Sequence, residues 1–261
     1  MTNETISTPF FQNYWHAVES GLSASPRHKS AAIRLSKSPP SAAQVKSLVH
    51  SLRESLEGPW WTNPCKREAA NWHWRKEIPA HTTTTAEVAL ERDVFSETPR
   101  TDWTCQMSTS SGLRGSRTDK RRAIDLVHRL DGKSYQFIEL KVGSDNPIYA
   151  AFEILGYGLA YCLARKNGFK GSGNHDVMAA SRIELVVLAP EPWYQYRVRG
   201  REDPRPFDLT WLTAAINEGL AAELQCLDIL GLQSVTFDFR CFERTAQMNS
   251  TVANVLHAMS R

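Results

Sequence analysis

Two apolar segments joined by a short Asp-Gly turn place the tightest constraint on the fold of this 261-residue chain. Residues 123–130 (AIDLVHRL) and 134–142 (SYQFIELKV) have the composition of strands, and Asp131-Gly132-Lys133 lies between them. An Asp-Gly pair between two such runs is a strong β-hairpin signal. We therefore expect an antiparallel hairpin near the middle of the chain.

The segments around the hairpin predict further helices and strands. In chain order we expect a helix over 84–95, a strand over 103–111, the hairpin, a helix over 147–165, a strand over 182–190, a helix over 208–227, a strand over 233–243 and a last short helix. The strands are apolar on both faces, which indicates a sheet covered by helices on both sides. The predicted class is α/β, with a mixed central sheet flanked by helices.

The first part of the chain predicts a helical extension. We expect residues 1–80 to form an N-terminal helical, Trp-rich region packed on the core, and residues 81–261 to form the main domain. Helices are expected over 9–22 and 41–57, the second ended by Gly58-Pro59, with a linker or mobile loop over 23–40. Four of the eight Trp fall between residues 60 and 74. They could stack nucleic-acid bases, but we favour a satellite core under the N-terminal helices.

Bulk properties restrict the class of protein without naming a function. The net charge of +3 permits a nucleic-acid partner but does not argue for one. The five Cys form no CxxC pair, which fits reduced, buried thiols. We find neither a signal peptide nor an uninterrupted apolar run of the ~18 residues that a membrane span needs. We expect a soluble, cytoplasmic protein with no membrane partner.

The hairpin turn sets which charged residues lie together. A three-residue turn at 131–133 pairs Leu130 with Ser134 and places Asp125 opposite Glu139. Alternation along the strand then puts Glu139, Lys141 and Asp125 on one face. Opposed acids repel unless a cation lies between them, and Mg²⁺ prefers carboxylate oxygens. A two-residue turn would instead separate the acids onto opposite faces.

One pattern in the hairpin resembles the signature of the PD-(D/E)XK nuclease superfamily. It consists of Asp125, 13 intervening residues and then Glu139-Leu140-Lys141, and the resemblance covers roughly residues 84–190. The resemblance implies a restriction-endonuclease-like fold and a Mg²⁺ or Mn²⁺ ion. It also implies that Asp125, Glu139 and the backbone carbonyl of Leu140 are metal ligands, and that Lys141 assists hydrolysis. Ile124 stands where the family signature has Pro.

The resemblance also directs attention to an acid on the helix before the hairpin. Glu87 and Glu91 lie one turn apart. Glu87 fits a capping box with Thr84, and Glu91 lies in the apolar arc that should face the sheet. We therefore prefer Glu91 as a catalytic residue and metal ligand. The alternative is a half-buried Glu91 paired with an Arg.

The helix after the hairpin carries a second family-like element. Glu153 and Tyr157 resemble a Gln-x-x-x-Tyr element of RecB-type nucleases, which implies that Tyr157 contacts nucleic acid. Glu stands in place of Gln, however, which weakens any phosphate contact at that position. The alternative is a solvated Glu153 and a packing Tyr157.

Two basic segments are candidate phosphate-binding loops. The loop before the hairpin supplies the candidate nucleic-acid-binding residues Arg114, Arg117, Lys120, Arg121 and Arg122. A second run contains Arg197, Arg199, Arg201 and Arg205. Phosphate neutralisation by such residues would make binding salt-dependent. The alternative for each segment is a solvated loop.

The sequence predicts a Mg²⁺-dependent deoxyribonuclease, with RNA left open as a substrate. One alternative is a catalytically silent nuclease-fold module that binds nucleic acid or a protein partner. Others are an unrelated α/β enzyme in which the D…ExK pattern is accidental, and a surface hairpin whose Asp, Glu and Lys face solvent. A homodimer is compatible with all of these.

Overall fold

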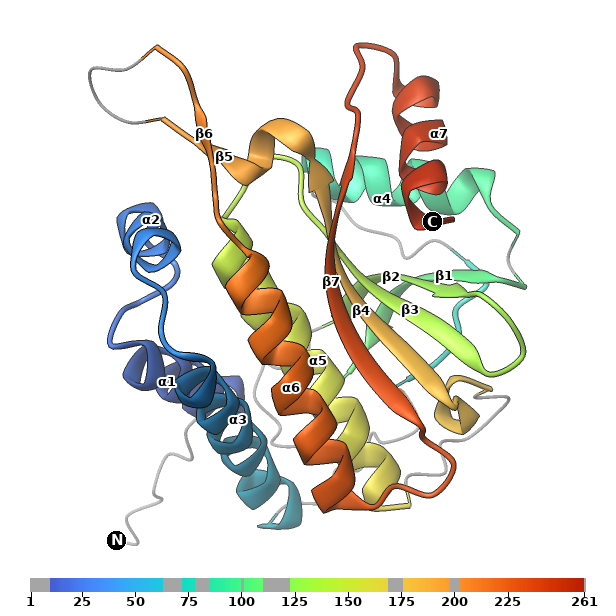
Figure 1. Cartoon of the computed structure of the whole chain (residues 1–261). Coiled ribbons are helices and arrows are strands. Elements are labelled where there is room, and N and C mark those ends of the chain that lie inside the picture. The colour runs from blue at the N-terminus through green and yellow to red at the C-terminus, as the bar shows by residue number, and fades with distance from the viewer. Residues whose placement is uncertain are drawn as a thin grey trace, which may run out of the picture.

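A computed structural model of the whole chain (Figure 1) describes residues 10–62, 72–77, 85–99, 101–109, 123–168, 176–197 and 202–260. Its centre is a five-stranded sheet in the order β1-β2-β3-β4-β7. The strands are β1 (Trp103–Ser108), β2 (Ala123–Arg129), β3 (Ser134–Leu140), β4 (Arg182–Pro190) and β7 (Ser234–Phe242). β1, β2 and β3 pair antiparallel, whereas β3–β4 and β4–β7 pair parallel. The predicted α/β class with a mixed sheet is therefore confirmed.

Helices cover both faces of this sheet (Figure 1). α5 (Pro147–Lys166) connects β3 to β4, and α6 (Thr210–Leu227) connects β4 to β7. These two helices share one hydrophobic core with Phe137, Leu185 and Phe237 of the sheet. α4 (Ala86–Glu97) and α7 (Met248–Met259) bury a second core on the other face, against Leu126 and Ile138. Short elements complete the described chain: η3 (Asp176–Ala179), η4 (Glu191–Tyr194), β5 (Gln195–Tyr196) and β6 (Arg205–Pro206).

α5 is the central helix of the larger core. Asn146 caps its N-terminus by accepting a hydrogen bond from the Tyr149 amide at 3.1 Å, and Pro147 occupies the first turn. Gly158 allows α5 to approach β4 closely, because a Cβ there would come within 2.5 Å of Leu185 Cδ1. The helix is long and apolar enough to cross a membrane. However, 94% of its most apolar stretch is buried inside the protein, which is typical of a core helix.

The N-terminal helices lie outside α5 and α6 and join the same core (Figure 1). They are α1 (Phe10–Leu22), α2 (Lys29–Lys37) and α3 (Ala42–Thr62). The Tyr14 hydroxyl donates to the Phe152 carbonyl at 2.5 Å, which ties α1 to α5. Arg53 on α3 donates to Glu223 on α6 at 2.8 Å, and both side chains are buried. These contacts fix the extension on the sheet-bearing part of the chain.

Two predicted boundaries in this extension are wrong. The segment 23–40, expected to be a linker, contains α2, because Ala32 and Leu35 bury an apolar stripe in the core. α3 also continues past Gly58-Pro59 to Thr62. A proline weakens a helix by about 3 kcal/mol without forbidding it. The preceding turns are held in the core by a row of buried apolar residues, so this penalty does not end the helix.

The aromatic and cysteine residues divide between core and surface. Trp72 is fully buried against Phe137 of β3 and Tyr161 of α5, so it belongs to the larger core of the sheet and not to a satellite core under the N-terminal helices. His128 stacks on Trp103 with ring centroids 4.1 Å apart, so it packs on the sheet. Of the described cysteines, Cys105 and Cys162 are buried, whereas Cys226 and Cys241 are exposed, contrary to expectation. Both lie at positions of α6 and β7 that face away from the core.

Candidate acidic site at the end of the hairpin

The β2–β3 register follows the prediction. Leu130 donates from its amide to the Ser134 carbonyl at 2.9 Å, and Leu126 pairs with Ile138. The predicted three-residue turn at 131–133 is therefore confirmed. One further step along this register places Asp125 opposite Glu139. The backbone ladder does not extend to that pair, and the Asp125 side chain bonds to the neighbouring strand instead.

Asp125 is half-buried at the end of the hairpin where Glu139 and Lys141 lie. Its Oδ2 accepts a hydrogen bond from the Leu140 amide at 2.9 Å, which fixes the carboxylate against β3. Burial raises the pKa of Asp125 to about 7, and the charge of Lys141 opposes this rise only in part. The acid is therefore poised between its charged and neutral forms near neutral pH.

Glu139 and Lys141 form a buried ion pair beside Asp125. The Lys141 Nζ lies 2.8 Å from Glu139 Oε1, and both side chains are nearly inaccessible. Glu139 Oε2 is also buried and has no hydrogen-bond partner among the described residues. Burial and the charge of Asp125 raise the pKa of Glu139 well above its ordinary range. The desolvation of this carboxylate oxygen is therefore not offset by a hydrogen bond from the described residues.

Lys141 contacts two more acids. Its Nζ lies 3.3 Å from Asp145 in the turn after β3 and 3.1 Å from Glu153 on α5. Burial lowers the pKa of Lys141, but the surrounding carboxylates outweigh burial and raise it. The ammonium therefore stays charged. Glu153 is not solvated as the alternative had it, because its carboxylate lies against Lys141 and its side chain is 13% exposed.

Glu91 reaches the same site from α4. It is 3% exposed and faces the sheet as predicted, and it accepts a hydrogen bond from Gln106 Nε2 at 2.8 Å. Burial and the charge of Asp125 raise the pKa of Glu91 to about 9. Gln106 has a left-handed backbone, with φ 49°, between the two residues of β1 that pair with Ile124 and Leu126. Such backbone strain is concentrated at functional sites, and no sequence signal pointed to Gln106.

Glu87 has a role that differs from the prediction. Thr85, not Thr84, is the N-cap of α4, and it accepts from the Val88 amide at 3.2 Å; Thr84 itself lies outside the described residues. Glu87 is thus displaced from the capping-box position. Its carboxylate accepts from the Ser144 hydroxyl at 2.5 Å and from the Val142 amide at 3.2 Å.

These hydrogen bonds decide the charge state of Glu87. Burial alone would raise its pKa, but the donors from Ser144 and Val142 outweigh burial and lower it. Glu87 therefore stays ionised and holds the turn after β3. Its helix neighbour Glu91 faces Asp125 instead, so the two acids of α4 have different environments.

A cavity of about 460 Å³ opens beside this site. It lies beyond the ends of β3 and β4, and its lining includes Val142, Asp145 and Trp193. Lys29 from α2 and Arg244 after β7 supply positive charge to the same wall. Ligands of sheets with parallel strands commonly bind outside the carboxyl ends of the strands. Asp145, which pairs with Lys141, connects this cavity to the acidic site.

The remaining predicted site residues have mixed outcomes. Tyr157 is 3% exposed and packs inside the larger core, so its ring does not lie on a nucleic-acid-binding surface. Leu140 contributes its amide to Asp125, as described above. Arg205 is exposed on β6. Arg197 is exposed as well, and the remaining basic candidates fall outside the described residues: Arg114, Arg117, Lys120, Arg121, Arg122, Arg199 and Arg201.

The donor chemistry of the site fits a hard divalent cation. Asp125, Glu139 and Glu91 supply carboxylate oxygens, and Glu139 Oε2 is an orphaned acceptor. Within the described part of the chain, however, no three Asp, Glu, His or Cys side chains are grouped in a way that could hold a metal. The Lys141 ammonium is the cation that the acids surround. A metal ion would therefore have to compete with it or draw the acids closer together.

Comparison of the chain with protein-family models, with curated proteins and with solved structures found no match.

Proposed function

We propose that this chain is a metal-dependent nuclease that hydrolyses phosphodiester bonds in DNA, with a restriction-endonuclease-like fold. The observation that carries the proposal is the unpartnered, buried Oε2 of Glu139 beside Asp125. A buried carboxylate oxygen without a partner is unfavourable unless a proton or a cation is supplied. The register of the hairpin, the lysine two residues beyond Glu139 and the adjacent cavity are consistent with the same chemistry.

In this proposal Asp125, Glu139 and Glu91 hold Mg²⁺ or Mn²⁺, together with the Leu140 carbonyl. A bound divalent ion would polarise the phosphate and lower the pKa of an attacking water. Lys141 positions that water or stabilises the charge that develops on the phosphate. Asp145 and Glu153 orient the Lys141 ammonium, since both lie within 3.3 Å of it.

A second candidate function is a nuclease-fold module that binds nucleic acid or a protein without cleaving. The observation that favours it is the full pairing of Lys141 with Glu139, Asp145 and Glu153. The lysine neutralises part of the acidic cluster without any metal.

Cleavage assays separate the two functions. Linear, circular, single-stranded and branched DNA are incubated with the protein in Mg²⁺, in Mn²⁺ and in EDTA. We expect metal-dependent cleavage, lost about a hundredfold or more in Asp125→Asn and Lys141→Ala. Asp131→Asn changes an exposed acid on the same hairpin, and Lys166→Ala changes a lysine paired with Glu57; both should retain activity.

Circular dichroism checks that each variant is folded. Full activity in folded Asp125→Asn would rule out the proposed site. No cleavage of any substrate by the wild-type protein, together with no calorimetric signal for Mg²⁺ or Mn²⁺, would favour the binding module.

A further inference from the structure

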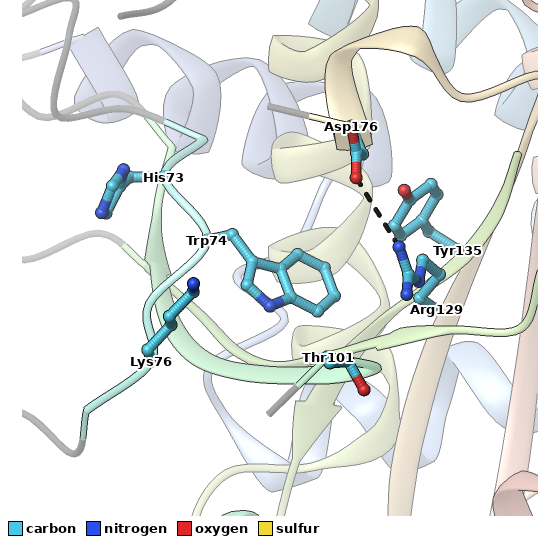
Figure 2. A pocket seen from close by; sticks show the side chains of 7 residues that line it. All are labelled: His73, Trp74, Lys76, Thr101, Arg129, Tyr135 and Asp176. Carbon is cyan, nitrogen blue, oxygen red and sulfur yellow. Dashed lines mark ion pairs between the residues drawn. The ribbon is translucent and has the colours of Figure 1, made fainter. Parts of the chain in front are cut away.

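A second cavity of about 460 Å³ lies at the opposite end of the same hairpin (Figure 2). Its lining consists of Arg129 and Tyr135 of the hairpin, Asp176 of η3, and His73, Trp74, Lys76 and Thr101. Its volume lies within the range of ~300–1,000 Å³ typical of small-molecule sites. Tyr135 precedes Glu139 by four residues on β3, a separation of about 13 Å. The cavity therefore shares no residue with the acidic site.

The Trp74 indole is the central part of the lining of this cavity. Figure 2 shows the Trp74 indole between His73 and Lys76 on one side and Arg129 and Tyr135 on the other. Trp74 is half-buried, and its ring meets the Tyr135 ring at 69° with centroids 6.0 Å apart.

The backbone after Trp74 is anchored to β1. The Arg75 amide donates to Thr104 Oγ1 at 2.8 Å, and the Thr104 hydroxyl donates to the Arg75 carbonyl at 3.1 Å. The indole is thus held in place by both packing and hydrogen bonds. It presents a fixed flat surface to the cavity.

Charged and polar groups surround the indole. The Arg129 guanidinium lies 3.6 Å from Asp176, an interaction drawn in Figure 2, and it donates to Asp102 at 3.1 Å. Lys76 adds an exposed cation on the other side. The Tyr135 hydroxyl is buried at the wall, close to Arg129. The cavity therefore combines an aromatic surface with cations and a hydroxyl group.

We propose that this cavity binds a nucleotide, with its base stacked on the Trp74 indole and its phosphate facing Lys76 or Arg129. Aromatic side chains stack on bases of any sequence, and Arg and Lys pair with phosphate oxygens. The Tyr135 hydroxyl can donate to or accept from a polar group at the base edge. A purely apolar ligand would make no use of the charged groups in this lining.

The test measures binding without cleavage. Isothermal titration calorimetry in EDTA uses thymidine monophosphate and a six-nucleotide thymidine strand as separate probes. We expect binding to wild-type protein, weakened at least about fivefold in Trp74→Ala. Trp211→Ala is the matched control, because Trp211 is also half-buried on the same core but lies at the start of α6. Its affinity should equal that of the wild-type protein.

A second variant tests the charge in the cavity and does not disturb the core. Asp176 is exposed, and Asp176→Asn removes the acid that competes for Arg129. We expect this variant to bind thymidine monophosphate more tightly than wild type, by about twofold or more. The gain should disappear in 0.5 M salt, because surface charges are then screened.

The two probes distinguish the source of the nucleotide. Binding of both identifies a site for a free nucleotide, and binding of the strand alone identifies a site for a nucleotide within a chain; both outcomes support the proposal. No binding of either probe at millimolar concentration would overturn it. Equal affinities in wild type, Trp74→Ala and Asp176→Asn would overturn it too. Because EDTA removes divalent metal, these results are independent of the proposed nuclease activity.

Discussion

Glu139 Oε1 lies 2.8 Å from the Lys141 ammonium, whereas Glu139 Oε2 is buried without a hydrogen-bond partner among the described residues. This asymmetry makes the ion pair incomplete in the absence of another cation or a proton. Lys141 is shared with Asp145 and Glu153, so its single charge faces three carboxylates. The stability of this part of the protein should therefore depend on pH, on Lys141 and on divalent metal.

Removing the lysine should destabilise the metal-free protein. Lys141→Ala leaves buried acids without their cation, and breaking a buried pair typically costs about 3–5 kcal/mol. We expect a loss of this order at pH 8 in EDTA and a smaller loss at pH 5, where the acids take up protons. Urea unfolding at both pH values measures the change. A loss at pH 8 no larger than that of Lys166→Ala would contradict the expectation.

The raised pKa values of the acids predict that the metal-free protein is most stable in mild acid. Asp125 and Glu91 have pKa values of about 7 and about 9 when folded, above their ordinary values of 3.8 and 4.5. The folded state then binds more protons than the unfolded state. Stability should fall as pH rises from about 5 to 9, with a slope of up to about 1.4 kcal/mol per pH unit for each group.

Glu91→Gln tests this dependence directly. The variant lacks the carboxyl group with the higher of these two pKa values, so its unfolding free energy in EDTA should depend less on pH and should exceed that of wild type at pH 8. Thermal unfolding between pH 5 and 9 measures the difference. A pH profile parallel to that of wild type would show that Glu91 does not titrate in this way.

Glu87→Gln should have the opposite effect. Because hydrogen bonds lower its folded pKa, Glu87 stabilises the protein above its ordinary pKa of 4.5, and this contribution is lost as pH falls through the folded value. The substitution should cost about 1–2 kcal/mol at pH 7, since it weakens the hydrogen bonds from Ser144 and Val142. Urea unfolding of Glu87→Gln and Glu91→Gln side by side should give changes of opposite sign.

Divalent metal should stabilise the wild-type protein if the acids bind it. A ligand at a hundred times its dissociation constant adds about 2.7 kcal/mol of stability. We expect Mg²⁺ or Mn²⁺ to raise the melting temperature, more at pH 8 than at pH 6, because binding must displace protons from Asp125. Asp125→Asn should abolish the shift and Asp131→Asn should preserve it. A shift of equal size in Asp125→Asn would place the metal elsewhere.

Trp72 should be essential to the core that supports Trp74. Trp72→Ala removes a fully buried indole that packs on Phe137 and Tyr161, and such truncations cost about 3–5 kcal/mol. Trp211→Ala, at a half-buried position, should cost less. Urea unfolding measures both. Equal, small losses would show that Trp72 is packed less tightly than the structure indicates.

The local sequence determined the hairpin and its register. Alternating side chains and the Asp-Gly turn depend only on neighbouring residues, so the positions of Asp125 and Glu139 could be predicted from residues 123–142. The inward face of Glu91 followed in the same way from helical periodicity. The strand boundaries agree closely with prediction for the same reason; β4, for example, spans the predicted residues 182–190.

Only the tertiary structure decided what surrounds these residues. Glu153 reaches Lys141 because α5 packs against β3. Glu87 reaches Ser144 because the first turn of α4 lies beside the turn that follows β3. The cavity around Trp74 likewise combines residues that are as far apart in the chain as Lys76 and Asp176. Periodicity fixes which way a side chain points along its own element, whereas its partners depend on how distant elements pack. The sequence by itself therefore located the acids and the lysine, and the packing of α4 and α5 decided their charge balance.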